Sequence, residues 1–294
     1  MIDPAERTEI SSCPGCSGDP IESRARHFTS SQLARCRVCR TEFLTSQPTT
    51  ARLAEIYGAD YFEPWAISDD PSVEEIKEQT FDPIIAASGV RAGDTLLDVG
   101  CATGVLVGQA MRAGVESYGI DVNEHAITEA RSGYPAGEFA AAVLADVPFP
   151  EVTFDAVTMV DLIEHVRDPE AELRQVARRL RPEGRVVVST PRVDSVLRWL
   201  LQGSWPQYRE EHLTYFSRSG MEAVMLRAGL TVLSVRATVK TLNLGYIHRH
   251  AEAFPMRGIT PLVRFAHSAA PFLRRLPLKV TLGEMTVVAT PTRG

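Results

Sequence analysis

The sequence predicts an α/β protein with a doubly wound, mostly parallel sheet of seven strands, preceded by a small N-terminal module. Three observations indicate this arrangement. Short apolar runs alternate with helix-like stretches from residue 80 onward, and such alternation favours right-handed crossovers with helices on both faces of one sheet. Aspartates stand at the ends of the first strands, where ligands bind in folds of this class. Four of the five cysteines lie before residue 40.

Strands are expected where apolar and β-branched residues run together between turn signals. They are TLLDV (95–99), SYGI (117–120), AVLA (142–145), AVTMV (156–160), RVVVST (185–190), TVLSVR (231–236) and EMTVVAT (284–290). Helix-like patterns occupy 104–113, 124–132, 169–181 and 217–229. The third of these leads into RRLRPEGR, and cations followed by glycine suit a helix C-terminus. We therefore expect one domain over residues 80–294.

The composition is that of a soluble globular chain. Its 294 residues are 44% hydrophobic and 23% charged, which is ordinary for a protein with a sizeable core. The net charge of −6 argues against a protein that coats nucleic acid. No apolar run is long enough to span a membrane, and the opening MIDPAERTEI lacks the basic and apolar regions of a signal peptide. The expected location is the cytoplasm.

The N-terminal cysteines form two CxxC pairs, CPGC and CRVC. In a reducing compartment such pairs indicate a metal before a disulfide. Two thiolates on a tight turn can reach one tetrahedral ion, and a second such turn completes four sulfurs around zinc. The module is too short for an apolar core, so the metal would supply its folding energy. We predict a structural zinc ribbon over residues 1–48, with four free or redox-active thiols as the alternative; the ligands would be Cys13, Cys16, Cys36 and Cys39.

A linker with a short helix is expected at residues 49–79. It is rich in Pro and Thr at its start and then carries an aromatic cluster. These side chains either pack the connector against the main domain or form the wall of a substrate pocket; they are Tyr57, Tyr61, Phe62 and Trp65.

The stretch LLDVGCATG (96–104) raises the question of which ligand approaches the backbone after the first strand. Glycines there remove the Cβ atoms from its path. The pattern lacks the third glycine of a dinucleotide fingerprint and the Lys-Ser/Thr of a phosphate loop. Asp98 would repel a pyrophosphate but attract an ammonium group. Asp121, which ends the second strand, can accept both hydroxyls of a ribose. A ligand with ribose, adenine and a cationic amino-acid tail fits, and S-adenosylmethionine is such a ligand.

The ordered motifs resemble those of class I S-adenosylmethionine-dependent methyltransferases, over about residues 80–236. The matching stretches are LLDVGCATG, YGIDVNEHAI, ADVPFPEVTFDAVTMVDLIEHVRDP, LRPEGRVVVSTP and HLTYFSRSGMEAVMLRAGL. The resemblance implies a Rossmann-like fold and this cofactor. It places cofactor-binding residues at four successive strand ends: Asp98, Gly100, Ala102 and Gly104, then Asp121 and Val122, then Asp146 and Val147, and Val160. Cys101 is interpreted as a small packing residue.

Methyl transfer is an in-line displacement, so it needs a base only where the acceptor must lose a proton. The sequence offers His165 after the fourth strand, and His212 and Tyr215 after the fifth. An imidazole titrates near neutral pH, so either histidine is a candidate general base. The alternative is that Glu164 and His165 are only a helix-start motif.

A divalent ion is a further hypothesis. Asp161, Glu164 and His165, with the distant His212, resemble the E-x-x-E-H metal motif of ubiquinone-pathway O-methyltransferases and of small-RNA 2′-O-methyltransferases. That resemblance implies Mg²⁺ or Mn²⁺ holding oxygens of the acceptor. The sequence departs from the motif at Asp161, where the family has glutamate.

Two other segments have open interpretations. Trp205 and Tyr208, between the fifth strand and its helix, either wall the substrate pocket or pack in the core. Residues 237–282 contain five arginines among apolar residues at helical spacing. This segment is predicted to form a helical lid, or the surface of a homodimer, before the last strand. A basic amphipathic stretch can also contact a membrane or an anionic substrate.

The sequence thus predicts a methyltransferase that acts on a small-molecule acceptor, with oxygen favoured as the methylated atom. Two alternatives stay open. One is an RNA methyltransferase that uses the ribbon as its RNA clamp, although residues 22–40 are only modestly basic. The other is a non-catalytic protein that binds S-adenosylmethionine.

Overall fold

The computed structural model describes residues 7–18, 21–24, 33–56, 71–149, 151–209, 211–253, 259–274 and 276–293. The aromatic cluster expected in the linker, from Tyr57 to Trp65, lies outside these residues.

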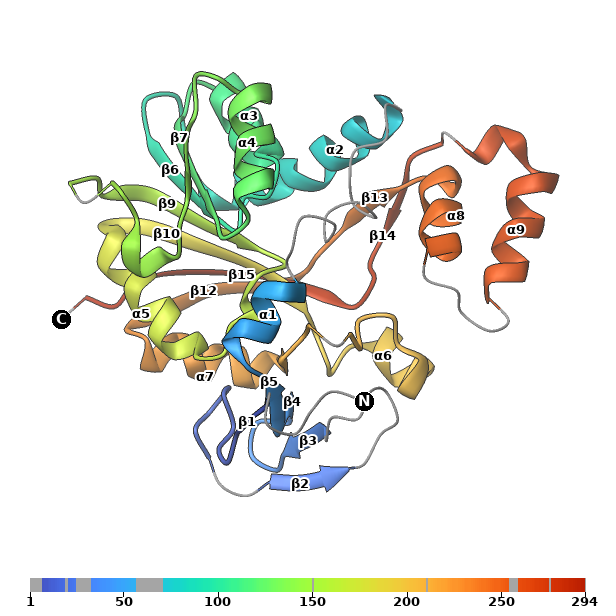
Figure 1. Cartoon of the computed structure of the whole chain (residues 1–294), viewed down its shortest axis with the longest axis horizontal. Helices are drawn as coiled ribbons and strands as arrows, with labels where there is room; N and C mark the ends of the chain where they lie inside the picture. The colour runs from blue at the N-terminus through green and yellow to red at the C-terminus, as the bar shows by residue number, and fades with distance from the viewer. Residues whose placement is uncertain are drawn as a thin grey trace.

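A seven-stranded sheet forms the centre of the molecule (Figure 1). Its strands are β6 (Thr95–Val99), β7 (Glu116–Asp121), β8 (Glu138–Ala141), β9 (Phe154–Val160), β10 (Leu180–Pro191), β12 (Leu230–Ala237) and β15 (Glu284–Pro291). The order is β12-β15-β10-β9-β6-β7-β8, and only β15 runs antiparallel to its neighbours. The predicted fold class is therefore confirmed.

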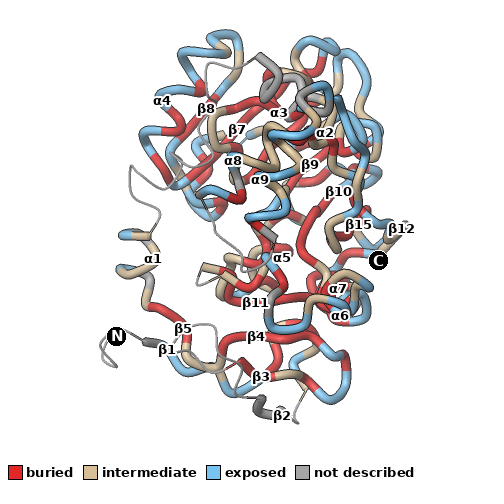
Figure 2. Tube along the Cα trace, turned by 90° about the vertical axis from the view of Figure 1, so that its right-hand side faces the viewer, coloured by how far each residue is buried: buried red, intermediate tan, exposed pale blue. Residues whose placement is uncertain are grey.

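Helices cover both faces of this sheet (Figure 1). One layer contains α2 (Pro71–Ser88), α3 (Val105–Arg112) and α4 (Glu124–Gly133); the other contains α5 (Pro169–Arg179) and α7 (Arg218–Arg227). Ile84 and Leu106 pack on one side of the strands, and Leu173 and Val224 on the other. Figure 2 shows the central strands buried and the outer turns exposed. The linker boundary expected at residue 80 falls inside α2.

The third strand lies earlier in the chain than the sequence suggested. The more apolar stretch 142–145 was predicted as the strand, but β8 is formed by 138–141, which pairs with β7. The chain then turns through the short helix η3 (Leu144–Asp146). Of the apolar residues in 142–145, packing explains Leu144, which is buried in the main core, while Val143 is exposed.

The N-terminal module is built into the rest of the molecule. Strand β1 (Arg7–Glu9) pairs with β5 (Ser46–Pro48), and helix α1 (Thr50–Ile56) follows. Strands β2 (Ile21–Arg24), β3 (Leu33–Cys36) and β4 (Glu42–Leu44) form an antiparallel sheet. A strand from far along the chain, β11 (Thr214–Tyr215), adds to this sheet beside β4. The module therefore shares a sheet with the segment that follows β10, and α6 (Val196–Leu201) and η5 (Gln202–Ser204) lie in the same segment.

A helical insertion separates β12 from β15. It rises on a two-stranded stem, β13 (Lys240–Leu242) and β14 (Leu278–Val280), and carries α8 (Leu244–Ala253), α9 (Ile259–Ala269) and η6 (Pro271–Arg274). In Figure 1 its two long helices project from one end of the molecule, with α9 outermost. Across the described ranges, no helix combines the length and apolar character that a membrane span requires.

Candidate active site

The chain turns sharply where β6 ends. Gly100 and Gly104 have φ of 77° and 79°, and Ala102 has φ of 46°, so three nearby residues adopt left-handed backbone. A β-carbon on Gly104 would lie 2.9 Å from the Phe139 ring, which accounts for glycine there. Cys101 is buried against the same ring, as expected for a packing residue. The turn brings bare backbone to the carboxyl edge of the sheet.

Asp121, at the end of β7, is held by this turn. Its Oδ2 accepts a hydrogen bond from the backbone N–H of Ala102 at 3.0 Å, and its Oδ1 accepts one from Asn123 at 2.9 Å. Each carboxylate oxygen can accept a further bond. The side chain of the next residue, Val122, is 59% exposed. A fixed carboxylate beside an exposed apolar side chain fits a ribose with its adenine ring.

Asp98 is buried one strand away from Asp121. The Thr158 hydroxyl donates to its Oδ1 at 2.6 Å. Burial raises the pKa of Asp98 to about 7, and the nearby Asp121 carboxylate adds to this rise. A cationic ligand would therefore favour the ionised form of Asp98, which suits the ammonium or sulfonium group of S-adenosylmethionine.

The remaining predicted cofactor residues lie along the same edge. Asp146 is exposed just after β8, Val147 beside it is buried, and Val160 is partly buried at the end of β9. Because β9, β6, β7 and β8 are adjacent, the predicted cofactor-binding residues follow four neighbouring strand ends. Their arrangement fits the cofactor, and their binding role stays a prediction.

Three of the expected metal or catalytic side chains converge after β9 and β10. Glu164 and His165 lie in the short helix η4 (Ile163–His165), and His212 precedes β11. One ligand atom from each lies within 4.8 Å of the other two. The two imidazole rings meet edge to face, with centroids 4.6 Å apart. His212 lies 47 residues after His165 in the chain, so folding brings the three side chains together.

The hydrogen bonds of the cluster fix the histidine tautomers. Nδ1 of His165 lies 3.0 Å from the carbonyl of Glu211, and Nδ1 of His212 lies 2.8 Å from that of Gln207. A carbonyl only accepts, so Nδ1 carries the proton in each ring and Nε2 is the basic nitrogen. Burial lowers the pKa of both histidines, most strongly that of His212, which favours neutral rings.

Glu164 is almost fully buried, and among the described residues one of its two carboxyl oxygens accepts a hydrogen bond while the other does not. Its Oε2 accepts a hydrogen bond from Thr190 at 2.9 Å, while Oε1 has no hydrogen-bond partner within the described part of the chain. Burial raises the pKa of this carboxyl well above its usual range. A buried oxygen without a partner costs free energy, so its place beside two basic nitrogens points to a bound cation or to a hydroxyl that donates to it.

Asp161, the fourth expected ligand, faces a lysine instead. Its Oδ2 lies 3.0 Å from Nζ of Lys240, which also lies 2.8 Å from Oε1 of Glu284. Gln207 donates to the same Glu284 oxygen at 2.9 Å. Burial opposes the charge on Lys240, but the two carboxylates outweigh it and raise the pKa of the lysine. Asp161 has φ of 50°, an uncommon conformation for a non-glycine residue at a site.

Sequence reasoning missed Lys240 and Glu284. Both lie far along the chain, in the stem of the insertion and at the start of β15, and neither belongs to a motif. The sequence feature that could have identified them is a charged residue within, or next to, an otherwise apolar strand-like stretch.

The aromatic candidates occupy structural positions. Tyr215 is buried, and its hydroxyl donates to the carbonyl of Arg209 at 2.9 Å. Trp205 and Tyr208 are buried in the same cluster, which favours the core-packing interpretation over the pocket wall. Tyr208 also donates to Glu42 of the ribbon at 2.5 Å. A catalytic role for Tyr215 stays a prediction, and its hydroxyl is already engaged.

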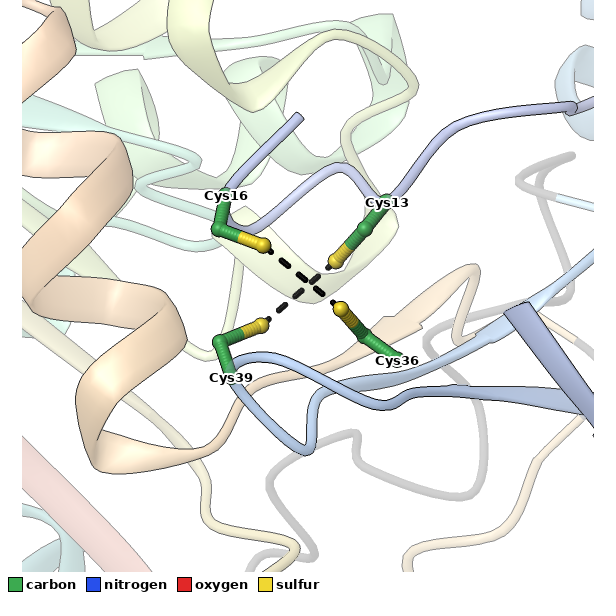
Figure 3. Close-up of side chains that lie close together, drawn as sticks. All are labelled: Cys13, Cys16, Cys36 and Cys39. Carbon is green, nitrogen blue, oxygen red and sulfur yellow. Dashed lines mark hydrogen bonds between the residues drawn. The ribbon is translucent and has the colours of Figure 1, made fainter. Parts of the chain in front are cut away.

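The four N-terminal cysteines converge on one point (Figure 3). The sulfurs of Cys13 and Cys39 are 3.6 Å apart, and those of Cys16 and Cys36 are 3.5 Å apart. Four sulfurs about 2.3 Å from a tetrahedral zinc lie about 3.8 Å from one another, so the cluster has nearly the required size. The donor set therefore fits zinc. The hydrogen bond between Cys13 and Cys39 lowers the pKa of Cys39 to about 5 and raises the pKa of Cys13, so this contact favours the metal-binding thiolate form at Cys39 only.

The ribbon is connected to the histidine cluster through the backbone. The N–H of Leu44 donates to the carbonyl of Leu213 at 2.9 Å, and the N–H of Leu213 donates to the carbonyl of Glu164 at 2.8 Å. Leu213 follows His212 directly. The position of His212 thus depends on strand β4 of the ribbon.

One ribbon carboxylate holds two side chains of the segment between β10 and β11. Glu42 accepts from Arg198 at 2.5 Å as well as from Tyr208. On the other side of the ribbon, Ser217 and Ser219 donate to the carbonyl of Cys39. These buried contacts join the cysteine cluster to α6, β11 and α7.

Residues 73–235 match the family model described as a methyltransferase domain. The chain belongs to this methyltransferase family. The methyltransferase is 33% identical over 158 residues to O-methyltransferase cnsE of Penicillium expansum, which covers 49% of this chain and 54% of that protein. It is 34% identical over 125 residues to the ubiquinone biosynthesis O-methyltransferase of Alkalilimnicola ehrlichii. The match covers 40% of this chain and 50% of that protein. The chain spans about half the length of these curated relatives.

Solved structures agree on the fold of the methyltransferase. A chain of the complex between the Haloferax volcanii Trm112 methyltransferase activator and a methyltransferase has a TM-score of 0.56 at 22% identity, over 80% of this chain and 97% of that one. Magnesium protoporphyrin IX methyltransferase of Synechocystis PCC 6803 with bound SAH has a TM-score of 0.55 at 15% identity, over 82% and 99%. The predicted Rossmann-like methyltransferase fold is confirmed.

Proposed function

We propose that this protein transfers a methyl group from S-adenosylmethionine to an oxygen of a small-molecule acceptor. The observation that carries the proposal is the pairing of two sites on one sheet edge. Asp98 and Asp121 stand where the cofactor fits, and the basic Nε2 atoms of His165 and His212 stand after the adjacent strands. The relatives named as O-methyltransferases support oxygen as the methylated atom.

The histidine cluster would prepare the acceptor hydroxyl. Nε2 of either histidine can accept the proton that the hydroxyl loses, because Nδ1 is occupied by a carbonyl. The group Glu164, His165 and His212 also fits a divalent ion, since it offers one carboxylate oxygen without a partner among the described residues and two imidazole nitrogens. Of the two expected ions this set suits Mn²⁺ better than Mg²⁺, because Mg²⁺ prefers oxygen ligands. A divalent ion supplies charge that stabilises an acceptor alkoxide. Asp161 is held by Lys240, so we propose three protein ligands.

The ribbon would act as a structural support for this cluster. Zinc at the four cysteines would fix β3 and β4, and β4 carries the hydrogen bond to Leu213. This supports a positioning role for the ribbon over an RNA clamp, together with the negative charge of the whole chain. The zinc itself would not contact the substrate, since four thiolates leave no open coordination position.

The test is methyl transfer from radiolabelled S-adenosylmethionine to a panel of phenols, catechols and aliphatic alcohols, with total RNA in parallel. We expect label in a small hydroxylated acceptor, and loss of at least about a hundred-fold in kcat for His212→Ala. The matched control is His125→Ala, which removes an exposed histidine of α4 and should leave activity unchanged. Label in RNA alone, or in no acceptor, would contradict the proposal.

A chelation experiment distinguishes the two proposed roles of the cluster, general base and divalent-ion site. A weak chelator followed by Mg²⁺ or Mn²⁺ should abolish and then restore turnover if a divalent ion is used. Turnover that is unaffected by chelation, with His212→Ala still inactive, would leave the histidines as general bases and remove the divalent ion from the proposal.

A further inference from the structure

Helix α9 is amphipathic, but polar side chains lie on the side that contacts the protein and large apolar side chains lie on the side that faces solvent. Its polar side chains face the neighbouring helix α8: Thr260 donates to the carbonyl of Ala251 at 3.3 Å, and Arg264 makes two hydrogen bonds of 2.6 Å to Glu252. The ring of His267 stacks on that of His248 with centroids 4.0 Å apart. Residues at positions i, i+4 and i+7 of α9 therefore pack on α8.

The opposite face of α9 is apolar and exposed. Leu262 is 66% exposed and Phe265 is 70% exposed. In the next element, η6, Phe272 is 77% exposed. Leu262 and Phe265 are three residues apart, on one side of α9; together with Phe272 they are called the stripe. A surface helix in water normally buries its apolar stripe, so this outward stripe points to an apolar partner.

The charge of the insertion identifies the kind of partner. Residues 237–283 contain seven lysines and arginines and one glutamate, in a chain whose net charge is −6. Of the cations outside the site, Arg274 in η6 and Lys279 in the stem strand β14 are exposed. A second copy of this chain would bring like charges together, which disfavours a dimer through this face. Nucleic acid would satisfy the charge but leave the phenylalanines exposed.

We propose that the stripe of Leu262, Phe265 and Phe272, with the exposed cations Arg274 and Lys279 of the same insertion, binds the surface of an anionic lipid bilayer. Helices that lie in the plane of an interface carry aromatic and aliphatic residues on one side and cations around them. In Figure 1 α9 is the outermost element of its end of the molecule, so a flat surface can reach it. This inference does not depend on the proposed function.

Vesicle sedimentation tests the proposal with the full chain. We expect the protein to sediment with phosphatidylcholine vesicles that contain about one third phosphatidylglycerol, and to do so weakly with phosphatidylcholine alone. The variant L262S/F265S/F272S should lower the partition coefficient about ten-fold or more. The variant R274Q/K279Q, or added salt, should weaken binding to the anionic vesicles only.

The control is L226S/L233S, which removes two exposed leucines of α7 and β12, outside the insertion, and should bind vesicles as the native chain does. Unchanged melting by circular dichroism establishes that each variant is folded. Equal binding by the triple variant, or no binding to anionic vesicles, would overturn the proposal. So would a concentration-dependent dimer in sedimentation velocity that the triple variant abolishes, because a second copy would then cover the stripe.

Discussion

At the scale of single residues, the two aspartates of the sheet edge differ in what holds them. Asp121 is fixed by two backbone N–H groups and keeps acceptor capacity for a ligand. Asp98 has one hydroxyl donor and is otherwise desolvated. The same residue type therefore suits a neutral diol at one position and a cation at the other.

Replacing Asp121 by Asn should weaken binding of S-adenosylmethionine. The substitution removes the charge that strengthens hydrogen bonds to the ribose hydroxyls, each worth about 1.5–3 kcal/mol, so the Kd should rise about ten- to a hundred-fold. Titration calorimetry measures it. The control Glu116→Gln changes an exposed carboxylate at the amino end of the same strand and should leave the Kd unaltered. Native affinity in D121N would exclude Asp121 from the ribose site.

Cofactor binding should also depend on pH through Asp98. Burial raises the pKa of this carboxyl from its ordinary value of 3.8 to about 7, so Asp98 of the folded protein holds a proton between these pH values. A cationic ligand binds the ionised form, and binding must then release that proton. Affinity should therefore rise up to about ten-fold per pH unit below pH 7 and level off above it.

Calorimetry in buffers of different ionisation enthalpy counts the released proton directly. Asp98→Asn cannot release it, so this variant should bind more weakly and lose the rise in affinity below pH 7. A native pH profile in D98N would assign the proton to another group.

At the scale of elements, the sequence located most of the sheet but not the contacts between distant parts. Strand–helix alternation and the aspartates predicted the strands around Asp98 and Asp121, because these signals are local. The strand at 138–141 was missed because EFAA is less apolar than the turn that follows it. The addition of β11 to the ribbon sheet was beyond prediction from Thr214 and Tyr215, since two-residue pairing leaves no pattern.

In the candidate site too, the sequence identified residues that belong to a motif and missed those that only folding brings together. Glu164 and His165 are neighbours in a motif, and resemblance added His212. Lys240 became visible only when the chain folded and brought the stem of the insertion to Asp161. An ion pair between residues 79 positions apart has no sequence signature.

Glu42 should be the residue that joins the ribbon most strongly to the segment between β10 and β11. Its removal leaves the Arg198 guanidinium buried without its carboxylate, so Glu42→Ala should lower the free energy of unfolding by about 3–5 kcal/mol. Urea denaturation measures this. The double variant E42A/R198M should recover part of the loss. Glu183→Ala breaks an exposed pair with Arg293 and should cost less than about 1 kcal/mol; a similar cost for Glu42→Ala would mean that Glu42 contributes little.

At the scale of the whole molecule, the shared sheet predicts that ribbon and methyltransferase domain unfold together. Strand β11 pairs with β4, and Arg227 of α7 donates to the carbonyls of Pro14 and Gly15 beside the first cysteines. A module whose sheet includes a strand from its neighbour cannot melt alone without breaking those hydrogen bonds. We therefore expect one cooperative transition for the complete chain.

Removing zinc should lower the Tm of that single transition, by about ten degrees or more, because the metal supplies much of the folding energy of the ribbon. Scanning calorimetry with and without a strong chelator measures the shift, and Cys13→Ser should reproduce it. S-adenosylhomocysteine, bound at the proposed site around Asp98 and Asp121, should raise the same transition and delay release of zinc to a colorimetric chelator. Two separate transitions, with the upper one indifferent to chelation, would show that the ribbon is an independent module and that His212 does not depend on it.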